Sequence, residues 1–192
     1  MEKKPVHVEH PFPPVWDRNS ETLILGSFPS VKSREEMFFY GHPRNRFWTV
    51  ISAVLGVEAP VSIEEKRAML LENHIALWDV IASCDIYGSA DSSIKNAVPN
   101  DIGLIVADSH IKKIFTNGAA ADRLYKKYIF PVTGIEAVRL PSTSPANAAK
   151  SLDALIEEWS VINANGRLSM QITVDSMRSN VIKFIEIYWG SL

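Results

Sequence analysis

The sequence predicts an α/β fold: a three-layer α/β/α sandwich around a central, mainly parallel sheet of four strands. Short apolar runs typical of buried strands alternate with segments of helical periodicity, and strands that alternate with helices form a parallel sheet covered on both faces. The length of 192 residues also suits a single compact domain with a sizeable core. The expected strands are 21–26, 75–82, 111–117 and 136–141.

Each expected helix has a signal of its own. In residues 45–55 apolar side chains recur at helical spacing, and Gly56 supplies a stop. Ser62 and Glu65 form a capping-box pattern, which predicts a helix from there to about Glu72. The remaining helices are expected over 100–108, 118–128 and 144–159.

We expect one domain over residues 1–160, which begins with an extended, proline-rich lead-in. Residues 161–192 differ from the rest, because a strand-like alternation is followed by an amphipathic helical pattern. They are predicted to form a C-terminal extension that either packs on the domain or binds a partner.

Composition and charge exclude several classes of protein. The 20 Lys and Arg against 22 Asp and Glu argue against a broadly basic nucleic-acid-binding surface, but not against a local basic patch. Cys84 is the single cysteine, which excludes an internal disulfide, a multi-cysteine zinc ribbon and an iron–sulfur cluster held by four thiolates. No apolar run approaches the roughly 20 residues that span a bilayer. We therefore expect a cytoplasmic protein without membrane association.

A metal site is not expected either. His7, Glu9 and His10 could contribute ligands, but nothing in the sequence completes their site, and a surface lead-in with two histidines is the simpler interpretation.

Three irregular segments, 27–44, 83–98 and 141–147, follow expected strands. Because ligands of open α/β sheets bind outside the carboxyl ends of the strands, we expect these segments to converge on one site. The motifs GSFPS and YGHPRNRFW bring hydroxyls, aromatic rings, a histidine, an asparagine and arginines to the first segment, and LPSTSPANA brings hydroxyls and an amide to the third. Arginines and helix N-termini suit phosphates. Phe47 and Trp48 are expected in the core.

Together, GSFPS, YGHPRNRFW, ALWDVIASCDIYGSADSSI and LPSTSPANA resemble the uracil-DNA glycosylase superfamily, and most of all its DNA-deoxyinosine (hypoxanthine-DNA) glycosylase branch. The resemblance runs in order from about Pro11 to Trp159. It implies a monofunctional base-excision repair enzyme that hydrolyses the N-glycosidic bond of a flipped-out deaminated base, hypoxanthine first, and leaves an abasic site. A uracil glycosylase acting on G:U mismatches and a catalytically silent DNA-binding relative are the alternatives.

The resemblance also implies catalytic residues. Relatives position the attacking water with an asparagine third in their first motif, but this chain has Phe28 there. Asn45 is the best substitute, since its amide can bind a water or the base, although asparagine at this place also suits a helix cap. Ser142 falls where relatives keep a histidine or asparagine that supports the leaving base.

Base binding is expected from Ser27, Phe28, Tyr40 and Asp79. Tyr40 falls where relatives stack an aromatic ring on the flipped base, with Phe39 as the second choice. Asp79 matches a base-reading asparagine, and its carboxylate could accept the N1–H of hypoxanthine; a loop-fixing aspartate is the alternative.

The resemblance implies double-stranded DNA with a damaged base as partner, a monomer associated with the nucleoid, and no metal, iron–sulfur cluster or organic cofactor. Ser144 falls where relatives contact a DNA phosphate, and Ala146 and Asn147 are positional candidates for the wedge that fills the vacated stack. Although the whole chain is slightly acidic, residues 27–48 carry four basic against two acidic side chains. Contacts with DNA are expected from His42, Arg44, Arg46, Ser144 and Asn147.

Overall fold

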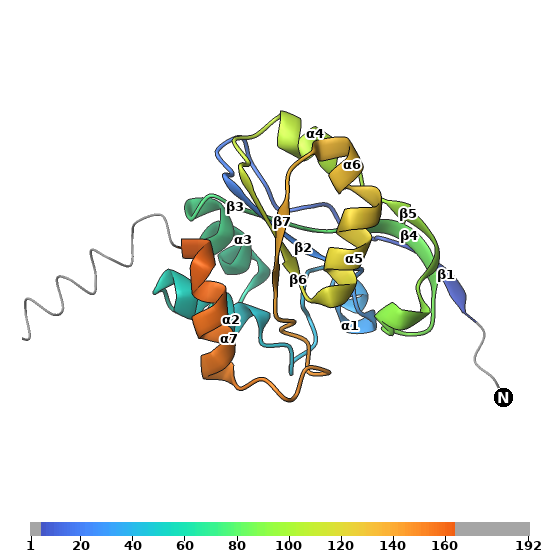
Figure 1. Ribbon diagram of the computed structural model, residues 1–192. Helices are drawn as coiled ribbons and strands as arrows, with labels where there is room; N and C mark the ends of the chain where they lie inside the picture. The colour runs from blue at the N-terminus through green and yellow to red at the C-terminus, as the bar shows by residue number, and fades with distance from the viewer. Residues whose placement is uncertain (1–4, 164–192) are drawn as a thin grey trace, which may run out of the picture.

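The computed structural model describes residues 5–163, and its centre is a parallel sheet of four strands (Figure 1). The spatial order is β3-β2-β6-β7, and every neighbouring pair is parallel. All four expected strands are therefore present, although the strand expected over 75–82 already ends at Asp79. Their bounds are Thr22–Gly26 for β2, Ile75–Asp79 for β3, Lys113–Asn117 for β6 and Ala137–Leu140 for β7.

Helices cover both faces of this sheet, which confirms the three-layer prediction (Figure 1). One face carries α2 (Phe47–Leu55), α3 (Ile63–Glu72) and α7 (Leu152–Trp159). The other carries α4 (Ile102–Ala107), α5 (Ala119–Tyr128) and α6 (Phe130–Thr133). Because side chains alternate along a strand, Ile24 packs in the first layer and Leu23 and Leu25 in the second.

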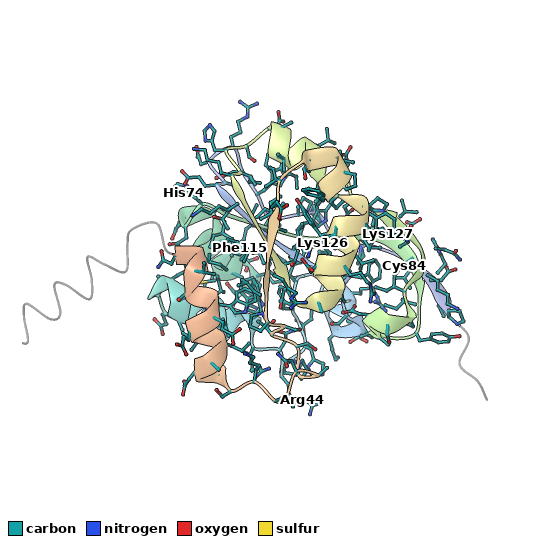
Figure 2. The ribbon with its side chains drawn as sticks, viewed as in Figure 1. Arg44, His74, Cys84, Phe115, Lys126 and Lys127 are labelled. Atoms are coloured by element: carbon teal, nitrogen blue, oxygen red, sulfur yellow. The ribbon has the colours of Figure 1, made fainter. Side chains whose placement is uncertain are left out.

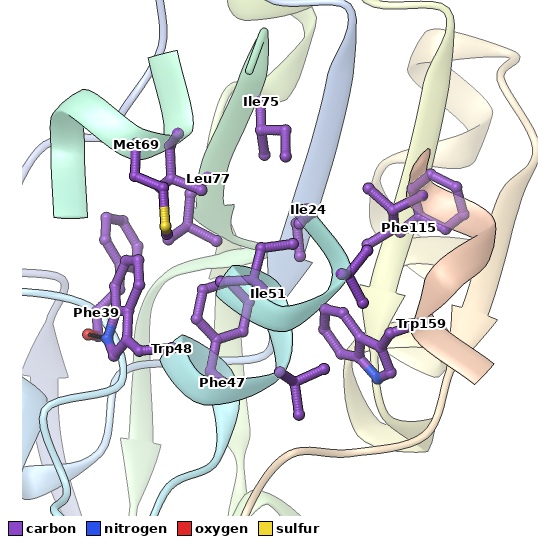
Figure 3. Packing of buried hydrophobic residues seen from close by; sticks show 14 of the residues in the cluster. Ile24, Phe39, Phe47, Trp48, Ile51, Met69, Ile75, Leu77, Phe115 and Trp159 are labelled. Carbon is purple, nitrogen blue, oxygen red and sulfur yellow. Dashed lines mark hydrogen bonds between the residues drawn. The ribbon is translucent and has the colours of Figure 1, made fainter. Parts of the chain in front are cut away.

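The α2 side of the sheet holds an aromatic core (Figure 3). Phe47 and Trp48 of α2 are buried there, as expected, and the Phe47 ring meets Trp159 of α7 edge to face at 5.7 Å. The Trp159 indole N–H also donates to the carbonyl of Pro141 at 3.0 Å. The core therefore fixes the start of the segment that follows β7.

A second sheet, antiparallel and three-stranded, lies beside the first (Figure 1). It contains β1 (Val6–Glu9), β4 (Ile81–Ile86) and β5 (Lys95–Pro99) in the order β1-β4-β5. The expectations of one strand over 75–82 and a loop over 83–98 were wrong here. The N–H groups of Val80 and Ile81 donate to the carbonyls of Gly26 and Ser27, and the chain then leaves β2 to pair with β1.

Several helix boundaries also differ from expectation. The helix expected over 144–159 starts only at Leu152, because the Ser151 hydroxyl caps it by accepting from Ala154 N–H at 3.2 Å. The segment 27–44 contains a short helix, α1 (Val31–Glu35), capped by Ser30. Segment 83–98 contains a 3-10 turn, η1 (Asp91–Ser93). The capping box of Ser62 and Glu65 opens α3 as predicted.

The described part of the chain ends in a second 3-10 turn, η2 (Ser160–Asn163), which packs on α2. Ile162 is buried, and the Asn163 amide donates to the carbonyl of Val54 at 3.0 Å. Nearly all of the C-terminal extension, with its strand and helix patterns, lies outside the described residues. Among residues 5–163, no helix is long and apolar enough to cross a membrane.

Candidate active site

A cavity of about 180 Å³ lies at the carboxyl ends of the parallel strands. Its walls come from the segment after β2, from η1, from the end of β6 and from the segment after β7, so the predicted convergence of the three loops is confirmed. The volume is below the roughly 300–1,000 Å³ of sites for drug-sized ligands, so the cavity suits one small group. Eight of the predicted site residues line the cavity: Ser27, Phe28, Tyr40, His42, Asn45, Asp79, Ser142 and Ser144.

Asn45 sits at the entrance of α2 with its amide orientation fixed. Its Oδ1 accepts from the backbone N–H of Phe47 at 3.0 Å and from the hydroxyl of Thr143 at 3.0 Å. Because a backbone N–H can only donate, the oxygen must lie on that side. The Nδ2 donor of Asn45 is therefore the group left for the cavity. The N-cap of α2 is Arg46 and not Asn45, but the Asn45 oxygen still satisfies the N–H of Phe47, the first residue of the helix, and this structural role is compatible with the predicted catalytic one.

A relay from β6 holds Asn45 in place. The Asn117 amide donates to the hydroxyl of Thr143 at 2.9 Å, and its oxygen accepts from the Thr143 N–H at 3.0 Å. The Thr143 side chain is buried, and its hydroxyl donates a hydrogen bond to Oδ1 of Asn45. Gly118, at φ 95°, lets the two segments approach, since a Cβ there would lie 2.8 Å from Cβ of Ser142. Sequence reasoning missed Asn117, although a polar residue before a glycine at a strand end was visible.

Asp79 ends β3 at the floor of the cavity. Its Oδ2 lies 2.9 Å from Nε2 of His10, and the side chains of the pair are only 5% and 3% exposed. A Cβ on Gly26 would overlap Oδ1 of Asp79, so glycine is required where β2 passes the carboxylate. The expectation that His10 belongs to a surface lead-in was wrong, because its ring lies among Phe12, Phe28 and Phe39.

Tyr40 contributes a ring and a free hydroxyl. One face of the ring stacks on Phe47, with centroids 4.0 Å apart, and the buried hydroxyl has no hydrogen-bond partner among the described residues. Burial, reinforced by the nearby Asp79 carboxylate, raises the pKa of Tyr40 above its ordinary value, so the hydroxyl keeps its proton. Its backbone has φ 53°, a strained value for a side chain of this size. The structure thus places a proton donor in the cavity that the sequence did not suggest.

Asp91 is a second carboxyl group in the cavity, and sequence reasoning missed it. It opens η1 and accepts from the Ser27 hydroxyl at 2.8 Å, so that this predicted base-binding hydroxyl is engaged with Asp91. Burial raises the pKa of Asp91, the Ser27 hydroxyl and Arg123 oppose the rise, and Asp79 adds to it.

The segment after β7 is held by its own polar groups. The Ser142 hydroxyl accepts from Ser144 N–H at 3.2 Å, and the Asn147 amide donates to the Ser142 carbonyl at 2.8 Å. Arg46 reaches across and donates to the carbonyls of Asn147 and Lys150. Its guanidinium therefore braces this loop, while Asn147 lines a groove that adjoins the cavity.

The charged side chains expected to contact DNA differ in exposure. Arg44 is exposed at the bottom of the molecule in Figure 2. The backbone N–H of Arg44 donates to Nδ1 of His42 at 3.1 Å. Lys32 pairs with Glu35, and Arg34 donates to the Pro29 carbonyl, so the positive charge of these two is directed inward or neutralised.

The histidines considered as metal ligands do not form a metal site in the described part of the chain. Within residues 5–163, no group of three histidine, cysteine or acidic side chains could hold an ion. His7 turns instead to Asp85, 2.9 Å away, and His10 to Asp79.

Two curated relatives share most of the chain. The hypoxanthine DNA glycosylase of Methanosarcina acetivorans is 35% identical over 157 residues, which cover 81% of this chain and 98% of that protein. The hypoxanthine DNA glycosylase of Methanosarcina barkeri is 32% identical over 150 residues, with coverage of 77% and 93%. The chain belongs to the hypoxanthine DNA glycosylase family. No protein-family model matches the sequence.

A solved structure places the hypoxanthine DNA glycosylase family in the uracil-DNA glycosylase superfamily. A candidate uracil DNA glycosylase from Methanosarcina acetivorans, solved by NMR in solution, superposes with a TM-score of 0.70 at 33% identity. The match covers 82% of this chain and 96% of that one. The resemblance seen in the sequence is thus confirmed for family and fold, whereas the roles of single residues remain predictions.

Proposed function

We propose that this protein hydrolyses the bond between hypoxanthine and deoxyribose in double-stranded DNA, leaving an abasic site. One observation carries the proposal. A cavity fitted to one base, on the fold of this family, presents the carboxylate of Asp79 as an acceptor and the amide of Asn45 as a donor. Both groups are held by further hydrogen bonds, so they are positioned before any base arrives.

The target base must leave the stack to reach these groups. The bond between base and sugar is inaccessible inside a duplex, so enzymes of this kind extrude the nucleotide into a pocket. Phe28, Phe39 and Tyr40 provide aromatic walls to receive it. Stacking on such rings is worth about 1–3 kcal/mol per base, which offsets part of the cost of unstacking.

Bond cleavage calls for donors. As the N9–C1′ bond breaks, negative charge develops on the purine and positive charge on the sugar; a water oxygen forms the new bond to C1′, and the proton that the water loses neutralises the released purine. Donors that already point at the base stabilise the first charge without reorganising. The Nδ2–H of Asn45 and the hydroxyl of Tyr40 are two donors of this kind. The Ser142 hydroxyl is a third, since it accepts from Ser144 N–H and keeps its own proton for the cavity. With its Oδ1 occupied twice, Asn45 can hold a water or the base only by donating.

Asp79 suits recognition of the base edge. Its Oδ2 is taken by His10, and its Oδ1 lies over Gly26 in the cavity. An acceptor there can bind the N1–H of hypoxanthine. Uracil carries a comparable donor, the N3–H between its two carbonyls, so it is the secondary substrate that this observation favours.

The groove beside the cavity offers a path for the DNA strand. It is lined by Ser142, Ser144 and Asn147; Arg139 supplies a basic side chain, whereas Lys150 pairs with Glu158, which lines the same groove. Arg44 is exposed next to this region and can meet a phosphate, whereas Arg46 would act by keeping the loop in shape. A monomer acting in the cytoplasm on the nucleoid is part of the proposal.

A single-turnover assay tests the function directly. Duplexes that carry one deoxyinosine or one deoxyuridine are mixed with excess enzyme, and strand breaks at abasic sites are revealed by alkali. We expect rapid release of hypoxanthine and slower release of uracil. Uracil released faster than hypoxanthine would favour a uracil glycosylase, and duplex binding without abasic sites would favour a silent relative.

A further inference from the structure

The side chain of His10 is buried against Asp79, and no step of the proposed reaction uses it. Its ring centroid lies 4.5 Å from that of Phe12, 6.2 Å from that of Phe28 and 6.0 Å from that of Phe39. The imidazole is therefore enclosed by aromatic rings, and its one polar neighbour among the described residues is the Asp79 carboxylate.

The contacts decide which ring nitrogen carries the proton. Nε2 lies 2.9 Å from Oδ2 of Asp79, whereas Nδ1 is buried without any hydrogen-bond partner. A carboxylate only accepts, so Nε2 must be the donor of this hydrogen bond. His10 thus donates one hydrogen bond to Oδ2 and leaves Oδ1 of Asp79 facing the cavity.

Hypoxanthine and adenine differ at the very edge that this oxygen would meet. Hypoxanthine has an N–H donor at N1 and a carbonyl at C6, while adenine has a bare N1 acceptor and an amino group at C6. A carboxylate oxygen opposite N1 pairs with the first and repels the second. A site built to bind one hydrogen-bonding pattern rejects the analogue that lacks it by about 10⁴–10⁵, because buried polar groups are then left unpaired.

We infer that His10 is a specificity-determining positioning residue: it holds Asp79 as an acceptor at the N1 edge, so that normal adenine is refused and deaminated adenine is accepted. The inference rests on the proposed function. Asp91 shares the cavity but is held by the Ser27 hydroxyl and not by an imidazole. Without His10, the Asp79 carboxylate would be free to turn away from the N1 edge of the base.

The test compares His10→Phe with His10→Gln. Phenylalanine preserves the aromatic packing and removes the donor, whereas the glutamine amide can still donate to Oδ2. Each variant is mixed in excess with a duplex that carries deoxyinosine or deoxyadenosine opposite an abasic analogue, so neither base is paired and extrusion costs are matched. The readout is the ratio of the two single-turnover rates, since a purely structural role would lower both rates together.

We expect a ratio of about 10⁴ or more for the wild type. The ratio should fall at least tenfold in His10→Phe and stay within about threefold of the wild type in His10→Gln. Asp79→Asn serves as a second variant should His10→Phe fail to fold, because its amide can turn a donor toward adenine N1; its ratio should also fall at least tenfold.

Two results would overturn the inference in distinguishable ways. A folded His10→Phe that loses both rates equally, with an unchanged ratio, would reduce His10 to a packing residue while the proposed function stands. A wild-type protein that releases no hypoxanthine would overturn the proposed function itself, and the inference with it.

Discussion

Replacing Asn45 separates its structural role at the start of α2 from the role in catalysis that we propose for it. The oxygen of its side chain accepts from Phe47 and Thr143, while its nitrogen faces the cavity. Asn45→Asp keeps an oxygen for both donors and loses the N–H. Asn45→Ala loses both the oxygen that accepts these hydrogen bonds and the N–H donor. The two variants should therefore differ in stability but resemble each other in rate.

The magnitudes follow from these contacts. Loss of the acceptor for the Phe47 N–H at the start of α2 costs about 1 kcal/mol, and the unpaired Thr143 hydroxyl adds to it, so Asn45→Ala should lose about 1–2 kcal/mol of unfolding free energy. For a chain of this length that lowers Tm by about 2–8 °C. Asn45→Asp should stay within about 0.5 kcal/mol of the wild type, because a carboxylate near a helix N-terminus is favourable. Both should lose about 10²–10³ in rate, the usual cost of one donor aimed at developing charge.

The measurements are thermal unfolding and single-turnover release of hypoxanthine under enzyme excess. Thr143→Val is the matched control, since it breaks the relay from Asn117 but leaves the Asn45 amide in the cavity. We expect it to lose about tenfold in rate. If Asn45→Asp released hypoxanthine as fast as the wild type, the amide donor would have no part in the reaction, and the assignment made here would be refuted.

Three further predictions rest on single contacts. Gly26→Ala should fold yet lose at least tenfold in single-turnover rate, because its methyl group displaces the Asp79 carboxylate; an unchanged rate would contradict the placement of Asp79. Asp91→Asn should raise Tm at pH 7.5 more than at pH 4. Burial raises the pKa of Asp91 in the folded protein above the ordinary 3.8, so wild-type stability falls as the pH rises from 3.8 through the folded pKa. A difference in Tm that did not change with pH would contradict this sign. Arg44→Ala should leave Tm unchanged and reduce the slope of log K for duplex binding against log salt concentration by about one. Arg46→Ala should lower Tm by about 2–4 °C, because it removes the donor that braces the loop after β7. The reverse pattern would contradict the roles assigned to the two arginines.

Local pattern was sufficient for most of the fold. The apolar runs of β2, β3, β6 and β7 and the capping box of α3 were readable because each depends on neighbours in sequence. The antiparallel sheet was not, since β4 and β5 mix polar and apolar residues, and β4 pairs with β1, a strand from the lead-in. Likewise the delayed start of α7 depends on Arg46, which holds residues 144–150 in a loop from 100 residues away along the chain.

The candidate site divides along the same line. Sequence alone was sufficient for the three-layer α/β/α sandwich, through the alternation of strands and helices. Through the resemblance of four motifs in order, it also determined the family and eight of the residues that line the cavity. It could not show that His10 faces Asp79, that Asn117 and Thr143 orient Asn45, or that Asp91 binds Ser27. The pairs His10–Asp79, Ser27–Asp91 and Asn45–Thr143 join residues 64 to 98 positions apart, and Asn117 and Thr143 are 26 positions apart. Periodicity reports only which face of an element is apolar, whereas the partner of a buried polar group is set by the packing of elements that meet only in the folded chain.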